Sequence, residues 1–113
     1  MHELGIVYEV IKIVDQFVVE NQLLKVEKIV LEIGELSQAI PRFIEECFPA
    51  AVADTPYETT ALEIVSVPAV AVCKSCHNEY GLIEHRKICP SCLSEDFTLI
   101  SGREFSIKEI AAY

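Results

Sequence analysis

The chain has 113 residues, of which 51% are hydrophobic, four are Gly and five are Pro. This composition is not that of a disordered or low-complexity chain. It predicts one compact domain with room for a small appendage. Its net charge of −9, from 18 acidic and 9 basic residues, repels phosphate backbones and excludes nucleic acid as the default partner. Cations and basic proteins suit this charge better.

Membrane insertion and export are both disfavoured by the sequence. No apolar run reaches the roughly 18 residues that a membrane span needs. The N-terminus lacks the basic start of a signal peptide, because His2 and Glu3 occupy it, and Glu9, Lys12 and Asp15 interrupt the apolar residues that follow. We therefore expect a cytoplasmic protein without a membrane partner.

The first predicted element is a helix over residues 4–20. A polar stripe recurs every three or four residues from Gly5 to Glu20, and apolar residues fill the remaining, wide arc of the helix. Such an arc is expected to pack against a sheet and something more. It permits a weak homodimer but does not require one, so we expect a monomer or weak homodimer.

Three strands and a second helix follow from the pattern of the remaining chain. Residues 26–33 alternate between apolar and polar, which predicts a half-buried strand that Gly34 stops. Pro41 suits the first turn of a second helix, and Pro49 is expected to kink or end that helix. Residues 61–67 and 104–110 are predicted as the second and third strands.

A different type of sequence lies between the last two strands. Residues 70–102 contain four of the five cysteines and two of the three histidines but few large apolar side chains, so this segment is expected to need a metal to fold. The predicted class is α+β, with a small three-stranded antiparallel sheet, two helices and an inserted zinc ribbon. The predicted domains are residues 1–69 with 103–113, and residues 70–102.

The four cysteines form two pairs with the spacing of a metal site. CKSC, with Cys73 and Cys76, and CPSC, with Cys89 and Cys92, are separated by twelve residues. Two such turns complete a tetrahedron, and four thiolates are typical of a closed, structural zinc site. Iron, as in rubredoxin-like electron carriers, is the alternative metal. Disulfide chemistry is disfavoured, because a metal would occupy both pairs and no export signal is present.

Three further residues qualify this interpretation. His77 and Leu93 follow the two cysteine pairs, where glycine is common, so the turns are expected to be strained or displaced. Replacement of a thiolate ligand by His77 is a possibility that the sequence leaves open. Cys47 lies among apolar residues and is expected to be a small, inert, buried side chain.

The N-terminus is a second candidate metal site. The Met1 α-amine and the His2 imidazole both titrate near neutrality, and with the His2 amide between them they can chelate a cation. The Glu3 amide or carboxylate could add a ligand. Nitrogen-rich ligand sets suit nickel(II) or copper(II). The competing interpretation is a frayed terminus whose histidine has no role.

The order of four motifs resembles one family. MHEL at the start, IGELSQAIPRFIEECF over 33–48, the two cysteine pairs and SGREFSI over 101–107 resemble the nickel incorporation protein HypA. The resemblance covers essentially the whole chain. It implies a small α/β domain with nickel at the N-terminus, ligated by His2 with the Met1 amine and the Glu3 position. It also implies a zinc site formed by Cys73, Cys76, Cys89 and Cys92.

The resemblance implies a nickel metallochaperone, not an enzyme. Such proteins pass nickel to the precursor of the [NiFe]-hydrogenase large subunit together with the GTPase HypB, and in some organisms also serve urease and its accessory proteins. The sequence contains no serine–histidine–acid signature and no glycine-rich phosphate loop. A zinc-ribbon nucleic-acid module and an iron-containing electron carrier are the alternatives from other classes.

Overall fold

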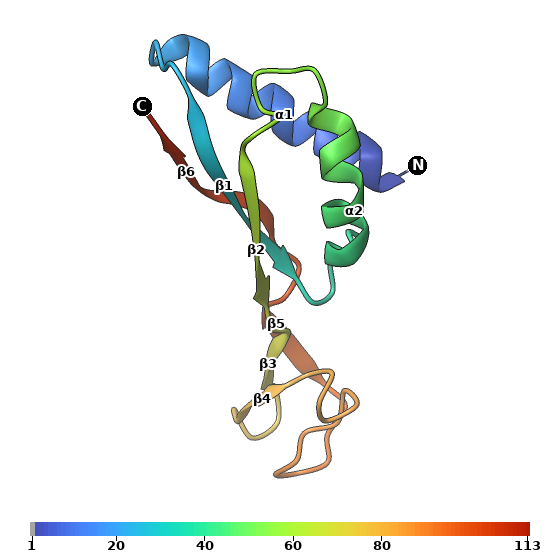
Figure 1. Ribbon diagram of the computed structural model, residues 1–113. Helices are drawn as coiled ribbons and strands as arrows, with labels where there is room; N and C mark the ends of the chain where they lie inside the picture. The colour runs from blue at the N-terminus through green and yellow to red at the C-terminus, as the bar shows by residue number, and fades with distance from the viewer. Residues whose placement is uncertain (1) are drawn as a thin grey trace.

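The computed structural model describes residues 2–113, apart from the side chain of His2. The chain forms an elongated body of 54 × 28 × 16 Å with two lobes (Figure 1). In chain order, the elements are α1 (His2–Glu20), β1 (Val26–Gly34), α2 (Pro41–Val52), β2 (Ala61–Val67), β3 (Val70–Cys73), β4 (Glu79–Gly81), β5 (Phe97–Ser101) and β6 (Phe105–Ala112). The helical lobe comprises α1, α2, β1, β2 and β6, and the cysteine lobe comprises β3, β4, β5 and their loops.

A three-stranded sheet of order β2-β1-β6 carries the helical lobe, and both helices lie on one face of it (Figure 1). The predicted class is confirmed, but the sheet is mixed rather than wholly antiparallel. Strand β6 runs antiparallel to β1, whereas β2 runs parallel to it. The reason is the connection: α2 carries the chain from the end of β1 back to the starting end of the sheet, and such a crossover joins parallel strands.

Alternation along β1 places one row of its side chains in the core. Ile29, Leu31 and Ile33 are at most 1% exposed, and they pack beneath α1 and α2. Burying each such side chain stabilises the fold by roughly 1.5–3 kcal/mol. The opposite face of the sheet carries exposed ion pairs, such as Lys28 with Glu63 at 3.5 Å, which contribute little.

The two helices pack on each other as well as on the sheet. Val7, Val10 and Val14 of α1 are buried, as the wide apolar arc predicts. No helix within residues 2–113 has both the length and the apolar character needed to cross a membrane.

The Tyr57 hydroxyl donates a 2.6 Å hydrogen bond to Asp15 and ties the loop after α2 to α1. Burial, with the hydrogen bond and charge of Asp15, raises the pKa of Tyr57 to about 12.

Helix α2 begins at Pro41 as predicted but continues past Pro49 to Val52. Pro49 has no N–H to donate to the carbonyl four residues earlier, which removes one helical hydrogen bond. Packing compensates for this loss, because Ala51 and Val52 of the last turn belong to the buried core. Cys47 is also part of that core at 7% exposure, so its prediction as a buried side chain is confirmed.

The cysteine lobe contains a second three-stranded sheet, of order β4-β3-β5, that the sequence pattern did not predict. Its buried cluster is small: Ala69, Ala71, Cys73, Tyr80, Leu82 and Cys89. Two of these six side chains are cysteines, so apolar burial alone is a weak source of stability in this lobe. The domain boundaries expected from the sequence stay a prediction.

The two lobes meet where the chain crosses between them twice, over residues 67–70 and 101–105. A Cβ on Gly34 would overlap the Gly102 carbonyl, and a Cβ on Gly102 would lie 2.7 Å from the Ala69 Cα. Gly102 also has a φ of +120°, which residues with a side chain rarely adopt. Two carboxylates secure the junction: Glu35 accepts a 2.9 Å hydrogen bond from the Ala69 amide, and Glu104 accepts one of 2.6 Å from the Gly102 amide.

The junction should therefore tolerate no side chain at Gly102. We expect Gly102→Ala to lower the free energy of unfolding by at least about 2 kcal/mol, from backbone strain together with overlap. Chemical denaturation followed by circular dichroism measures the change. The matched control is Gly5→Ala, because Gly5 is helical with open space around it and gains about 1 kcal/mol of helix propensity. Equal stability of Gly102→Ala and the wild type would contradict this account.

Candidate metal centre

The two cysteine pairs form two turns with the same backbone hydrogen bonds. In the first, the His77 amide donates to the Cys73 carbonyl at 2.9 Å, and in the second, the Leu93 amide donates to the Cys89 carbonyl at 2.9 Å. His77 has a φ of 64° and Leu93 a φ of 65°, both in the left-handed region. The strain expected at these two positions is thus confirmed, and it has the same origin in both turns.

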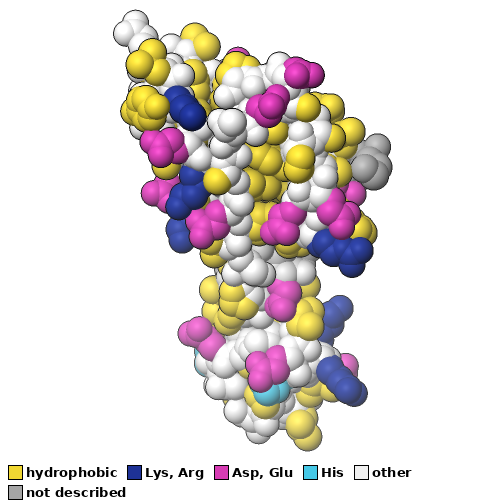
Figure 2. Space-filling view, viewed as in Figure 1, with side chains coloured by type: hydrophobic (Ala, Val, Ile, Leu, Met, Phe, Trp, Pro, Cys, Tyr) yellow, Lys and Arg dark blue, Asp and Glu magenta, His cyan; other side chains and the backbone are white. Residues whose placement is uncertain are grey.

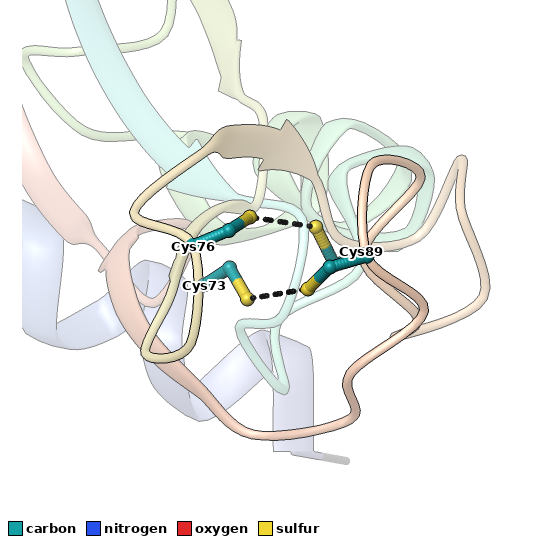
Figure 3. Close-up of side chains that lie close together, drawn as sticks. Cys73, Cys76 and Cys89 are labelled. Carbon is teal, nitrogen blue, oxygen red and sulfur yellow. Dashed lines mark hydrogen bonds between the residues drawn. The ribbon is translucent and has the colours of Figure 1, made fainter.

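The turns bring all four sulfur atoms together. The Cys73, Cys76, Cys89 and Cys92 Sγ atoms lie within 4.8 Å of one another. Figure 3 shows Cys73 and Cys76 of the first turn facing Cys89 of the second. The Sγ atoms of Cys73 and Cys92 are 3.5 Å apart, and those of Cys76 and Cys89 are 3.6 Å apart. A tetrahedral ion with metal–sulfur bonds of about 2.3 Å requires sulfur–sulfur distances of about 3.8 Å. The cluster therefore fits one tetrahedral metal ion.

Electrostatics within the cluster explain why it needs a cation. The Cys76 amide, with further backbone and thiol donors, lowers the pKa of Cys73 to about 6 despite burial. At Cys92, the Ser94 amide favours the thiolate, but the neighbouring Cys73 sulfur, burial and the other two cysteines outweigh it and raise the pKa to about 12. The pKa of Cys89 is lowered and that of Cys76 is raised. The four groups therefore do not ionise together at neutral pH without a positive charge among them.

The surroundings of the cluster include contacts that the cysteine spacing does not reveal. The Asn78 side-chain amide lies 4.0 Å from the Cys89 Sγ, where it can donate to a thiolate. Tyr80 is 5% exposed and packs edge-on against His85. Burial, then the four neighbouring cysteines, raises the pKa of Tyr80. In the sequence, these contacts are indicated only by position, because Asn78 and Tyr80 follow the first cysteine pair.

The polar residues near the cluster do not add a ligand. His77 is exposed and is not among the residues whose ligand atoms converge within the described chain. Lys74 forms an ion pair with Asp96 at 3.7 Å, so its charge is already compensated. Cys73 and Cys89 are buried and Cys76 and Cys92 exposed, so one side of the cluster faces solvent.

The start of α1 belongs to the helical lobe, away from the cysteine cluster. Met1 and the His2 side chain, both predicted nickel ligands, fall outside the described part of the structure. Glu3 is half-buried in the first turn of α1. It lines a cavity of 370 Å³ between the two helices, together with Leu4, Phe43, Glu46, Cys47 and Ala50. Figure 1 shows the start of α1 beside α2, with the cysteine lobe at the opposite end of the body.

Comparisons with known proteins agree over the whole chain. Residues 1–112 match the family model described as HypA, hydrogenase/urease nickel incorporation, metallochaperone. The hydrogenase maturation factor HypA of Trichodesmium erythraeum is 39% identical over 110 residues, covering 97% of this chain and 94% of the relative. The hydrogenase maturation factor HypA 1 of Bradyrhizobium diazoefficiens is 36% identical and covers 97% of each chain.

Solved structures share the fold. The solution structure of the Ni metallochaperone HypA from Helicobacter pylori superposes with a TM-score of 0.65 at 22% identity, covering 97% of this chain and 96% of that one. A second solution structure, of a HypA protein, gives a TM-score of 0.71 at 23% identity, covering 100% and 97%.

The left-handed residues after the cysteine pairs generate one prediction. We expect His77→Gly to tighten metal binding two- to fivefold. Glycine removes a penalty of about 1–2 kcal/mol for the left-handed backbone conformation. Part of that gain is lost, because glycine gives the unfolded chain more conformational freedom. The control is His77→Ala, which keeps the strain and should bind as the wild type does. Competition with a chromophoric zinc chelator measures the affinity. Weaker binding in both variants would instead assign a metal-binding role to His77.

Removal of the metal generates a second prediction. We expect a strong chelator to unfold the cysteine lobe and leave the core of the helical lobe folded, because the two lobes have separate buried clusters. Amide hydrogen exchange should then become fast over residues 70–101 and stay slow over residues 28–33. Adding zinc back should restore protection. Simultaneous loss of protection in β1 and β3 would show that the lobes unfold as one unit.

Proposed function

Because this chain belongs to the HypA family of hydrogenase and urease nickel-incorporation metallochaperones, we propose that it binds nickel(II) at its N-terminus and delivers it to a [NiFe]-hydrogenase precursor. The family consists of maturation factors, so the protein is not an enzyme. The four cysteines hold a structural zinc ion in this proposal, and nickel is the cargo.

The proposed nickel ligands are the Met1 amine, the His2 imidazole and amide, and the Glu3 position. Helix α1 begins at His2, and the first four amides of a helix have no acceptor within it. Replacement of one of these amide protons by a metal therefore breaks no helical hydrogen bond. Nickel(II) favours such nitrogen-rich, square-planar ligand sets. Binding displaces protons from the amine, the imidazole and an amide, so the affinity should fall as the pH is lowered.

The closed geometry of the cysteine cluster is the observation that most supports an N-terminal nickel site. Four sulfurs at tetrahedral spacing satisfy one metal ion completely, with no open position for a second ligand or an exchanging cargo. A metal that must be passed on needs an accessible site elsewhere. The N-terminus is suited to this role, because metal can leave it without unfolding either lobe.

Zinc, rather than iron, is proposed for the cysteine cluster. The exposed Cys76 and Cys92 leave one side open to solvent. Within residues 70–102, the aromatic side chains that could shield the cluster are the buried Tyr80 and the half-buried Phe97. A redox-inert ion that stabilises the fold is consistent with this setting.

The proposed partners follow from the family. They are the GTPase HypB and the precursor of the hydrogenase large subunit, and urease accessory proteins are a further class, since the matched model covers hydrogenase and urease. A cytoplasmic location and a monomeric or weakly dimeric state stay predictions from the sequence.

The N-terminal site is tested by nickel titration of protein with its native start. We expect His2→Ala to reduce nickel affinity at least tenfold, because it removes the imidazole. One glycine added before Met1 should have a similar effect, because it moves the amine and leaves every side chain in place. Isothermal titration calorimetry on zinc-loaded protein measures both.

His85→Ala is the matched control, because it removes a histidine in the other lobe and should leave nickel affinity unchanged. Zinc content should stay at about one per chain in every variant, in colourless preparations, as four-thiolate zinc coordination implies. Unchanged nickel binding in both N-terminal variants would rule out the proposed site, and red, iron-containing protein would rule out zinc.

A further inference from the structure

Strand β5 is an edge strand with two adjoining cavities along it. Within residues 2–113 it pairs only with β3, so its other backbone edge has no strand partner. A cavity of 230 Å³ is lined by Leu36, Leu82, Lys87, Phe97, Leu99 and Arg103. A second of 490 Å³ is lined by Leu99, Ile100, Ser101, Arg103 and Glu104. The two cavities share Leu99 and Arg103, and we call them together the β5 groove.

The floor of the groove is apolar. Leu82 is 2% exposed and belongs to the buried cluster of the cysteine lobe, against which Leu36, Phe97 and Leu99 pack. Ile100 lies further along the groove and is 52% exposed. Small-molecule sites usually enclose about 300–1,000 Å³. The smaller cavity, of 230 Å³, falls below that range, so it suits one large side chain of a peptide better than a whole ligand.

The walls of the groove carry two positive charges, Lys87 and Arg103. Among the described residues, neither Lys87 nor Arg103 forms an ion pair, although the chain has twice as many acidic as basic residues. Glu104 is the one carboxylate among the residues that line the groove, and its Oε1 accepts a 2.6 Å hydrogen bond from the Gly102 amide. Figure 2 shows Lys and Arg side chains on one side of the lower lobe, beside exposed hydrophobic side chains.

We propose that the β5 groove binds an extended acidic segment of a partner protein, with one large apolar side chain in the smaller cavity. An unpaired strand edge supplies backbone hydrogen bonds to an extended peptide, and pockets beside it select alternate side chains. The two cations select carboxylates. RNA is a disfavoured occupant, because the net charge of −9 on the chain repels its phosphate backbone. Leu36 and Arg103 come from the junction, so the segment contacts both lobes.

This proposal does not depend on the nickel site, and its test uses zinc-loaded protein without nickel. The probe is acetyl-Glu-Phe-Glu-Val-Glu-amide, titrated into ¹⁵N-labelled protein and followed by amide chemical shifts. We expect weak, saturable binding with shifts confined to residues 36, 82, 87 and 97–104. The neutral probe acetyl-Gln-Phe-Gln-Val-Gln-amide should bind at least fivefold more weakly.

Matched variants distinguish specific binding in the groove from non-specific electrostatic attraction. Lys87→Ala with Arg103→Ala should weaken binding of the acidic probe at least fivefold, whereas Lys12→Ala with Lys25→Ala changes the net charge equally and should leave it unchanged. Zinc content and thermal unfolding check that all variants are folded. Lys87→Arg with Arg103→Lys should restore binding.

Four results would overturn the proposal. Equal binding of both probes would remove the role of charge, and equal weakening in both alanine pairs would show non-specific attraction. Tighter binding of an octameric oligoadenylate at the same residues would assign the groove to RNA. A dimer in light scattering, with line broadening confined to residues 97–101, would show that β5 pairs with a second copy of the chain.

Discussion

Convergence of four sulfur atoms is the constraint on which the rest of this structure depends. The cysteine lobe buries only six side chains in its cluster, two of them metal-binding cysteines, so hydrophobic burial alone cannot offset the entropy of ordering the segment. Both turns hold a non-glycine residue in the left-handed region, which adds a further cost. A metal ion at the centre supplies the missing stabilisation and balances the charge of the thiolates.

The helical lobe has a buried core of its own, and the cysteine lobe adds to its stability through chain connectivity. Strand β6 is the antiparallel partner of β1, yet the chain reaches it only after passing through the whole cysteine lobe. A folded cysteine lobe returns the chain to a point beside its departure and so lowers the entropy cost of closing a long loop. The close approach of Gly34, Gly102 and Ala69, with the carboxylates of Glu35 and Glu104 as hydrogen-bond acceptors, then fixes how the lobes meet.

Division into two lobes also suits the proposed division of roles. A structural metal is best held where every ligand position is filled, and a cargo metal where ligands can be exchanged. The cysteine cluster meets the first requirement. The start of α1, at the other end of the body, is a candidate for the second, and the cavity lined by Glu3 lies beside it. The β5 groove combines Leu36 and Arg103 of the junction with Leu82 and Phe97 of the cysteine lobe, so a peptide bound there would contact both lobes.

Sequence by itself determined the elements whose signal is local. Alternation in residues 26–33 predicted β1, the cysteine spacing predicted the four-sulfur cluster, and the residues after each pair predicted strained turns. Only the tertiary structure decided the parallel direction of β2, the extension of α2 past Pro49 and the sheet of the cysteine lobe. The β5 groove, which joins residues from position 36 to position 104, was equally beyond local reasoning. These features depend on contacts between segments distant in the chain, and packing there outweighs local preference.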